Sequence, residues 1–137
     1  MSIQRLLIAN RGEIAIRISR AARTLNIFCI AIFPEDDAAL HAQIMDAAEL
    51  LPGTGPAAYL DIEAVITVAK KCNADAIHPG YGFLSENPEF ARRCAEEDIV
   101  FVGPDYNTLQ VLADKSAARA LAIEVGVPVL ADRKSVV

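Results

Sequence analysis

Residues 78–87, with the sequence HPGYGFLSEN, combine side chains that could do chemistry with glycines that could let a ligand approach. His78 ends a short apolar run, and ligands of open α/β sheets bind beyond the carboxyl ends of the strands. Gly80 and Gly82 permit positive φ angles or close backbone approach. The residues around His78 do not form a recognised catalytic-triad or metal-binding pattern, so neither kind of site is indicated. The segment is interpreted as a ligand-binding loop or, alternatively, as a tight strand-to-helix connection whose aromatic side chains fill the sheet edge.

A second candidate is Lys115, which directly follows Asp114, the expected cap of a helix. A cation in the first turn opposes the helix dipole. That position becomes favourable when an anion binds there, because helix N-termini accept phosphate groups. Lys115 is therefore either an exposed lysine or a contact for an anionic ligand.

Polar residues recur at helical spacing near the N-terminus, in the order Glu13, Arg17, Arg20 and Thr24. One interpretation is a solvated helix face with a Glu13–Arg17 ion pair. The other is a protein–protein contact, since arginine is enriched at the centres of interfaces. The turn before this helix contains only Gly12, which does not favour a dinucleotide site of the Gly-x-Gly-x-x-Gly type.

The elements that must position these residues alternate along the chain. Short apolar runs predict buried strands, and amphipathic stretches between them predict helices. The order predicts an open, Rossmann-like α/β fold with a mostly parallel sheet and helices on both faces. The expected strands are 5–9, 28–33, 74–78 and 99–102, with a weaker one at 47–51. The expected helices are 13–25 with Ile14, Ile18, Ala21 and Leu25 inward, one capped by Asp61, one capped by Asn87 before Pro88, and one at 105–112. A last helix is capped by Asp114, has Ala118, Leu121, Ala122 and Val125 on one face, and is ended by Gly126 and Pro128.

Composition limits the classes of function. The chain has 137 residues, 53% of them apolar, and a formal net charge of −5. This describes one globular domain, without the basic surface that nucleic-acid binding needs or an apolar run long enough to span a membrane. The N-terminus becomes charged too early for a signal peptide. Cys29, Cys72 and Cys94 lie far apart in apolar segments and are expected to be buried, reduced thiols.

Three segments together resemble the N-terminal domain of biotin carboxylase, as found in acetyl-CoA, propionyl-CoA, pyruvate and acyl-CoA carboxylases. They are LIANRGEIAIRISRAARTLNI, HPGYGFLSEN and FVGP…LADKSAARALAIEVGVPV. The resemblance covers nearly the whole chain in the same order. It implies a pre-ATP-grasp domain over residues 1–130, with 131–137 as a tail or a truncation edge. The implied reaction of the parent enzyme activates bicarbonate with ATP, through carboxyphosphate, and carboxylates N1′ of biotin, with Mg²⁺ or Mn²⁺ bridging the phosphates.

The resemblance also assigns expected roles to residues. Lys115 matches the family's ATP-contacting lysine, although Ala113 stands where the family commonly has glycine before the Asp-Lys pair. Tyr81, with Gly80 and Gly82, is expected near the biotin site. Arg20, and with it Arg17 on the same helix, is expected at a dimer contact.

The family's ATP-grasp lid, metal-binding glutamates and catalytic arginine fall beyond residue 137, so the sequence predicts no catalytic residue, no metal ligand and no carboxylase activity in this chain alone. Expected partners are the remaining biotin carboxylase domains, the biotin carboxyl carrier and the carboxyltransferase, besides a second copy in a homodimer. The expected compartment is the cytoplasm, or the mitochondrial matrix in a eukaryote. Two alternatives stay open: the first domain of another ATP-grasp ligase, of the carbamoyl-phosphate synthase type, and a non-catalytic assembly module of the same fold.

Overall fold

The computed structural model describes residues 2–131 and confirms the predicted α/β class. Five parallel strands form one sheet in the order β3-β2-β1-β4-β5. They are β1 (Arg5–Ile8), β2 (Phe28–Pro34), β3 (Ala47–Leu51), β4 (Ala76–His78) and β5 (Val100–Phe101). The helices are α1 (Gly12–Thr24), α2 (Ile62–Lys71), α3 (Pro88–Glu96), α4 (Tyr106–Ala113) and α5 (Lys115–Glu124), with short 3-10 turns η1 (Leu40–Ile44) and η2 (Pro56–Leu60).

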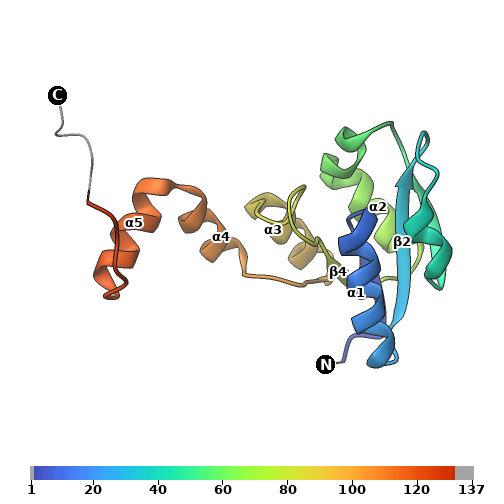
Figure 1. Cartoon of the computed structure of the whole chain (residues 1–137), viewed down its shortest axis with the longest axis horizontal. Coiled ribbons are helices and arrows are strands. Elements are labelled where there is room, and N and C mark those ends of the chain that lie inside the picture. Colours follow the sequence, from blue (N-terminus) through green and yellow to red (C-terminus); the bar gives the residue numbers. More distant parts are fainter. Residues whose placement is uncertain (1, 132–137) are drawn as a thin grey trace.

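Helices cover both faces of the sheet because alternate residues of the central strands point in opposite directions. Leu6 and Ile8 of β1 pack with α1 on one face. Leu7 packs on the other face in the core that includes residues of α2 and α3. The β-strands and these three helices make the rounded body seen in Figure 1. The expectation of helices on both faces is therefore confirmed.

The predicted caps form as hydrogen bonds. Asp61 accepts from the backbone N–H of Ala64 at 3.0 Å, and Asn87 accepts from that of Phe90 at 3.2 Å. Asp114 accepts from two backbone N–H groups at the start of α5, at 2.8 Å and 3.1 Å. Each cap satisfies donors that the first helical turn leaves without an intrahelical partner.

The predicted inner face of α1 is partly wrong. Its buried residues are Ala15, Ile18, Ser19 and Ala22, whereas Leu25 is 70% exposed. Small side chains let the helix approach the sheet closely, so the larger apolar residues are displaced to its flank. There they border a groove of about 400 Å³, lined by Ile3, Leu6, Ile14, Arg17, Ile18, Ala21, Ala22, Leu25, Ile27, His78 and Val102.

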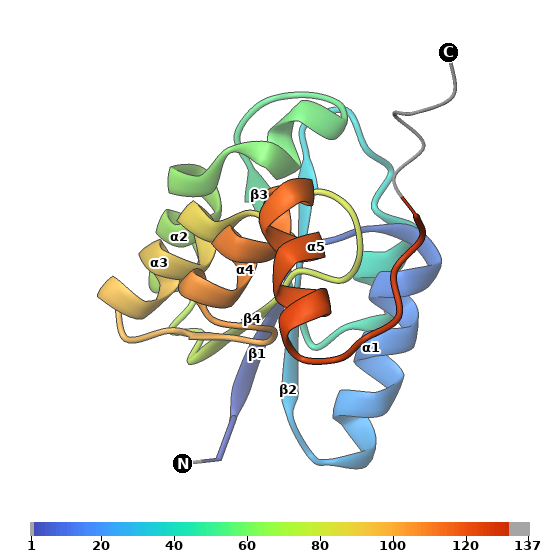
Figure 2. The ribbon, with the colours of Figure 1, turned by 90° about the vertical axis from the view of Figure 1, so that its left-hand side faces the viewer.

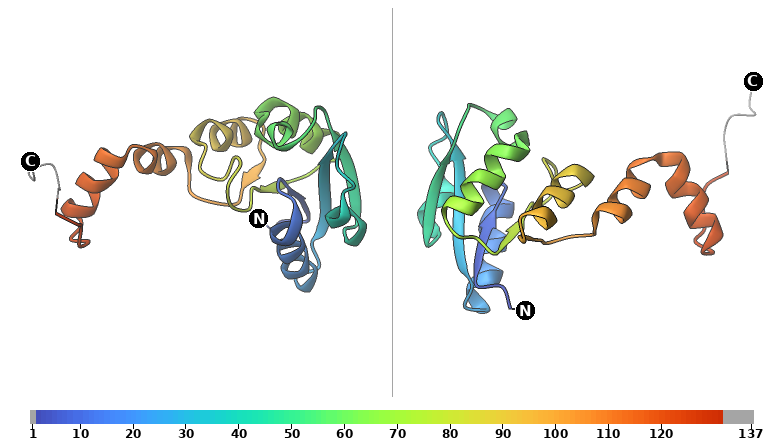
Figure 3. Two further views of the ribbon diagram at one scale, coloured as in Figure 1. Left: turned by 45° about the horizontal axis from the view of Figure 1, so that its top comes forward. Right: turned by 180° about the vertical axis from the view of Figure 1, so that it is seen from behind.

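The apolar face predicted for α5 is not covered, because no residue of α5 is buried. Helices α4 and α5 form an arm (residues 105–131) that projects away from the body (Figures 1 and 3). Helix α5 packs against α4, and α4 packs against α3. Seen along the arm in Figure 2, α5 lies in front of the body. Gly126, at φ +81°, ends the helix as predicted, and the Arg119 side chain donates to the carbonyl of Leu130 at 3.1 Å.

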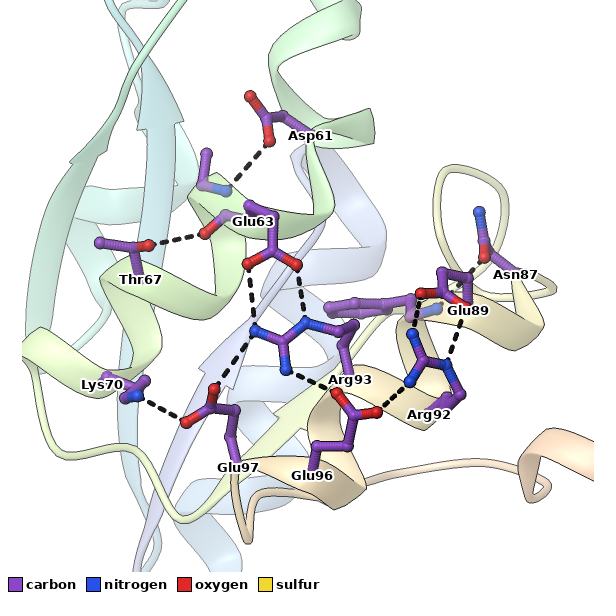
Figure 4. Close-up of polar contacts among 12 residues, drawn as sticks. Asp61, Glu63, Thr67, Lys70, Asn87, Glu89, Arg92, Arg93, Glu96 and Glu97 are labelled. Carbon is purple, nitrogen blue, oxygen red and sulfur yellow. Dashed lines mark hydrogen bonds and ion pairs between the residues drawn. The ribbon is translucent and has the colours of Figure 1, made fainter.

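Ion pairs join α2 to α3 on the outside of the body (Figure 4). Arg93 of α3 donates to both carboxylate oxygens of Glu63 on α2, at 2.7 Å and 3.0 Å. It also pairs with Glu96 and Glu97 of its own helix. Glu97 in turn accepts from Lys70 of α2. The two helices are thus held side by side by polar contacts as well as by the core beneath them.

Within residues 2–131 there is no helix with the length and apolar character needed to cross a membrane.

Candidate functional site

The strand order reverses between β1 and β4. From β1 the chain builds outward through β2 to β3, then returns to place β4 and β5 on the other side of β1. Open α/β sheets bind ligands in the crevice beyond the carboxyl ends of the strands at such a point. Asn10 follows β1 and the segment 79–87 follows β4. The motif HPGYGFLSEN therefore lies at the edge of the sheet where a ligand is expected.

Asn10 joins the two segments at this point. Its side chain is buried, with only 3% of the residue exposed. The Nδ2 amide donates to the carbonyl oxygens of Pro79 and Tyr81, each at 2.8 Å. Its Oδ1 accepts from the backbone N–H of Arg11 at 2.8 Å. The carboxamide thereby supplies hydrogen-bond partners both to the N–H group at the start of α1 and to two carbonyl groups of the glycine-containing loop.

His78 is half-buried at the end of β4. Its Nδ1 accepts a hydrogen bond from the backbone N–H of Gly80 at 3.0 Å, so the ring proton of the neutral form lies on Nε2. Burial lowers the pKa of His78 below its usual value. This arrangement supports a structural role, in which the imidazole shapes the turn that leads into the loop.

Tyr81 is 62% exposed, and its hydroxyl donates to the carboxylate of Glu13 in the first turn of α1. The bond to Glu13 raises the pKa of the Tyr81 phenol. The expected ion pair between Glu13 and Arg17 is absent from the ion pairs of residues 2–131. Glu13 is instead the partner of the predicted site tyrosine.

These residues border an open cleft of about 390 Å³, lined by Asn10, Arg11, Gly12, Glu13, Ile14, Tyr81, Gly82 and Phe83. The loop is anchored beneath by Phe83, which stacks on Tyr59 with ring centroids 4.8 Å apart. Tyr59 is fully buried. Gly80 and Gly82 both have positive φ, +66° and +68°, which confirms the expected conformational demand on the two glycines.

Lys115 borders a second cleft, of about 540 Å³, between the same loop and the arm. Its lining residues are Ser85, Glu86, Pro104, Leu109, Leu112, Ala113 and Lys115. The loop therefore contributes Tyr81 and Gly82 to one cleft and Ser85 and Glu86 to the other. The motif and the lysine, which are the two main candidates from the sequence, therefore border the same cleft.

The two arginines of the predicted dimer contact differ in their surroundings. Arg17 is exposed and borders the apolar groove beside α1. Arg20 is exposed on the same helix. Neither lies among the residues that line the cleft at Tyr81.

Sequence reasoning missed Asn10 and Glu13 as members of the site. Asn10 belongs to no binding motif that the sequence displays, and Glu13 has the spacing that predicts a pair with Arg17. The strand order was the missing information, since it brings the ends of β1 and β4 together. With that order known, a polar residue directly after β1 would have been a candidate.

The three cysteines are buried and free, as predicted. Burial raises the pKa of all three thiols, that of Cys94 to about 12. Among residues 2–131, no group of three or more histidine, cysteine or acidic side chains is arranged to hold a metal ion.

Comparison with known proteins identifies relatives that match most of the chain. Residues 2–109 match the family model described as biotin carboxylase, N-terminal domain. The chain is 55% identical to a pyruvate carboxylase of Staphylococcus aureus over 131 residues, which is 93% of this chain and 11% of the relative. It is 43% identical to biotin carboxylase 1 of Bacillus subtilis over 137 residues, which is 98% of this chain and 30% of the relative.

Comparison with solved structures identifies the same kind of domain. The biotin carboxylase domain of a single-chain bacterial carboxylase superimposes with a TM-score of 0.90 at 51% identity, over 97% of this chain and 32% of that one. The chain thus spans between about a tenth and a third of the length of the proteins that it matches.

Proposed function

Since the chain belongs to the family of biotin carboxylase N-terminal domains, we propose that it acts as the first domain of an ATP-dependent biotin carboxylase. The observation that carries the proposal is the match to biotin carboxylase 1 of Bacillus subtilis over 98% of this chain. The family match favours a carboxylase over the carbamoyl-phosphate synthase alternative. The predicted absence of carboxylase activity in the chain alone stays a prediction.

ATP is proposed to approach Lys115. The fit rests on the position of this cation beside the cleft between the loop and the arm. Asp114 already accepts from the N–H groups of Ser116 and Ala117, so a phosphate would meet the ammonium group of Lys115 rather than those backbone donors. In the proposed reaction ATP activates bicarbonate and biotin accepts the carboxyl group. The Mg²⁺ or Mn²⁺ ligands are proposed to come from another domain.

Biotin is proposed to lie near Tyr81, Gly80 and Gly82. The support is the open cleft at the switch point of the sheet, to which Tyr81 presents an exposed aromatic ring. A hydrogen-bonded phenol and a ring face are suited to a ureido group, which has polar edges and a flat face. Arg17 and Arg20 are proposed to contribute to a homodimer contact, and the cytoplasm or the mitochondrial matrix is the proposed compartment.

The arm is proposed to pack against further domains of the carboxylase. Exposed apolar side chains are concentrated on it, and contiguous apolar surface marks interaction sites. These residues are Val111, Leu112, Leu121, Ile123, Val125, Val127, Val129 and Leu130. The carrier and carboxyltransferase parts are proposed as later partners of the whole enzyme.

A hybrid protein tests the proposal. Residues 1–137 replace the matching segment of Bacillus subtilis biotin carboxylase 1, and ATP hydrolysis is measured with bicarbonate, Mg²⁺ and free biotin. We expect biotin-dependent phosphate release from the hybrid and none above blank from the 137-residue chain. A hybrid that matches the native relative in circular dichroism and elution volume, yet shows no biotin-dependent release, contradicts the proposal and favours the assembly module.

A further inference from the structure

We infer that Asn10 is a positioning residue for the proposed biotin site, holding the loop 79–83 so that the Tyr81 side chain stays at the edge of the cleft. The inference rests on the proposed function for the identity of the ligand. The contacts themselves belong to this chain. Asn10 lies one residue beyond Ala9 at the end of β1, and the loop begins directly after β4, so the carboxamide spans the reversal of the strand order.

The donor capacity of Asn10 is fully used on the loop. Both hydrogens of its Nδ2 are directed at carbonyl oxygens on either side of Gly80, those of Pro79 and Tyr81. Two donors from one rigid planar group fix both the position and the rotation of the intervening peptide units. Because Asn10 is 3% exposed, water cannot easily replace the carboxamide there. The carbonyl of Pro79 would then lose its partner in a buried setting and that of Tyr81 in a partly buried one, which is costly.

Tyr81 has a second attachment, and it leads back to the same turn. Its hydroxyl donates to Glu13, while Asn10 accepts from the backbone of Arg11. Tyr81 is thus attached to the β1–α1 turn at its backbone through Asn10 and at its side chain through Glu13. With the backbone bond removed, the loop is free to shift relative to α1, and the hydroxyl loses its fixed approach to the carboxylate.

The first test is a titration of the Tyr81 phenol in the 137-residue chain. Tyrosine labelled with ¹³C at Cζ is followed by NMR as the pH rises, and the Tyr81 signal is identified by its loss in Tyr81→Phe. The bond to Glu13 raises the pKa of Tyr81, so Asn10→Ala should move it back toward the ordinary value. Ser19→Ala is the control, because Ser19 is buried on α1 and its hydroxyl bonds, within residues 2–131, to the carbonyl of Ile16 of the same helix. An unchanged Tyr81 titration in Asn10→Ala overturns the inference.

The second test asks whether the positioning serves biotin. In the hybrid carboxylase, Asn10→Ala should raise the KM for free biotin about five- to tenfold, the size expected for one lost hydrogen-bonding arrangement. The KM for ATP should not change. Tyr81→Phe should act in the same direction, and the double variant should be no worse than the more affected single variant, because Asn10 acts through Tyr81. Additive effects, or an unchanged KM for biotin, overturn the inference.

Two outcomes keep this inference separate from the proposed function. A wild-type hybrid without biotin-dependent turnover contradicts the proposed function, and the link of Asn10 to biotin fails with it, whereas the titration still decides whether Asn10 holds Tyr81. If Asn10→Ala does not fold, by circular dichroism, Asn10→Asp replaces it. The aspartate has the same size and keeps the acceptor for Arg11 but offers no donors to the loop at neutral pH.

Discussion

A Cβ atom at Gly80 would lie 2.6 Å from Nδ2 of Asn10, and 3.0 Å and 3.1 Å from the next two atoms of the same side chain. A Cβ atom essentially never lies within 3.0 Å of such a non-bonded atom, so a side chain at position 80 would require a shift. Asn10 cannot move aside freely, because the same nitrogen bonds both carbonyls that flank the glycine. The glycine and the asparagine therefore require each other: the missing side chain at position 80 is the space that the carboxamide occupies.

The two loop glycines provide a matched pair. Gly80 and Gly82 have nearly equal φ angles, but a Cβ at Gly82 meets no atom within 4 Å. Gly82→Ala should destabilise the protein by about 1–2 kcal/mol, the cost of a left-handed conformation. Gly80→Ala should cost about 1–3 kcal/mol more, because the steric displacement of Asn10 is added. Urea unfolding of both variants measures the difference. Equal losses of unfolding free energy in the two variants would show that Asn10 moves aside without a free-energy cost.

Most of the sheet could be predicted from the sequence, because buried parallel strands leave continuous apolar runs. The caps Asp61, Asn87 and Asp114 could be predicted too, since a side chain that accepts from its own helix is a local feature. The strand order is not local. Without it the meeting of Asn10 and Pro79, which are 69 positions apart, could not be foreseen. The exposure of α5 was also hidden, because an apolar stripe on a helix does not tell which surface covers it.

The burial of His78 in the folded protein predicts that the free energy of unfolding depends on pH. Burial lowers the pKa of His78 in the folded protein below the ordinary histidine value of about 6.5, so the unfolded chain takes up a proton at higher pH than the folded one. The contribution of His78 is complete above about pH 6.5 and is lost as the pH falls through the folded pKa. The free energy of unfolding should therefore fall between pH 7.5 and 5.5.

The matched variant for this prediction is His78→Asn. An asparagine Oδ1 can accept the Gly80 N–H in place of Nδ1 but does not titrate. Urea midpoints at the two pH values should differ less in His78→Asn than in the wild type. If the urea midpoint depended equally on pH in both proteins, His78 would not be the source of that dependence.

Arg93 should matter more to stability than its neighbour Arg92. Arg93 joins α3 to Glu63 of α2 and is the less exposed of the two, at 18% against 43%. Within residues 2–131 the ion pairs of Arg92 are with Glu89 and Glu96 of its own helix, and exposed intrahelical pairs contribute little. Arg93→Ala should lower the urea midpoint more than Arg92→Ala does. Since charge pairing is screened by salt, the difference should narrow in 1 M NaCl; a difference that salt leaves intact would point to packing instead.

The most direct measurement of the central claim, that this domain helps to bind ATP, is the affinity of the hybrid carboxylase for ATP with Mg²⁺, determined by isothermal titration calorimetry without bicarbonate or biotin. Lys115→Ala should weaken binding about tenfold or more, as expected when a charged group loses its partner, while the fold is retained because Lys115 is exposed. Lys71→Ala is the control, since Lys71 pairs with Glu49 and borders neither cleft. Unchanged affinity in a folded Lys115→Ala hybrid would contradict the account.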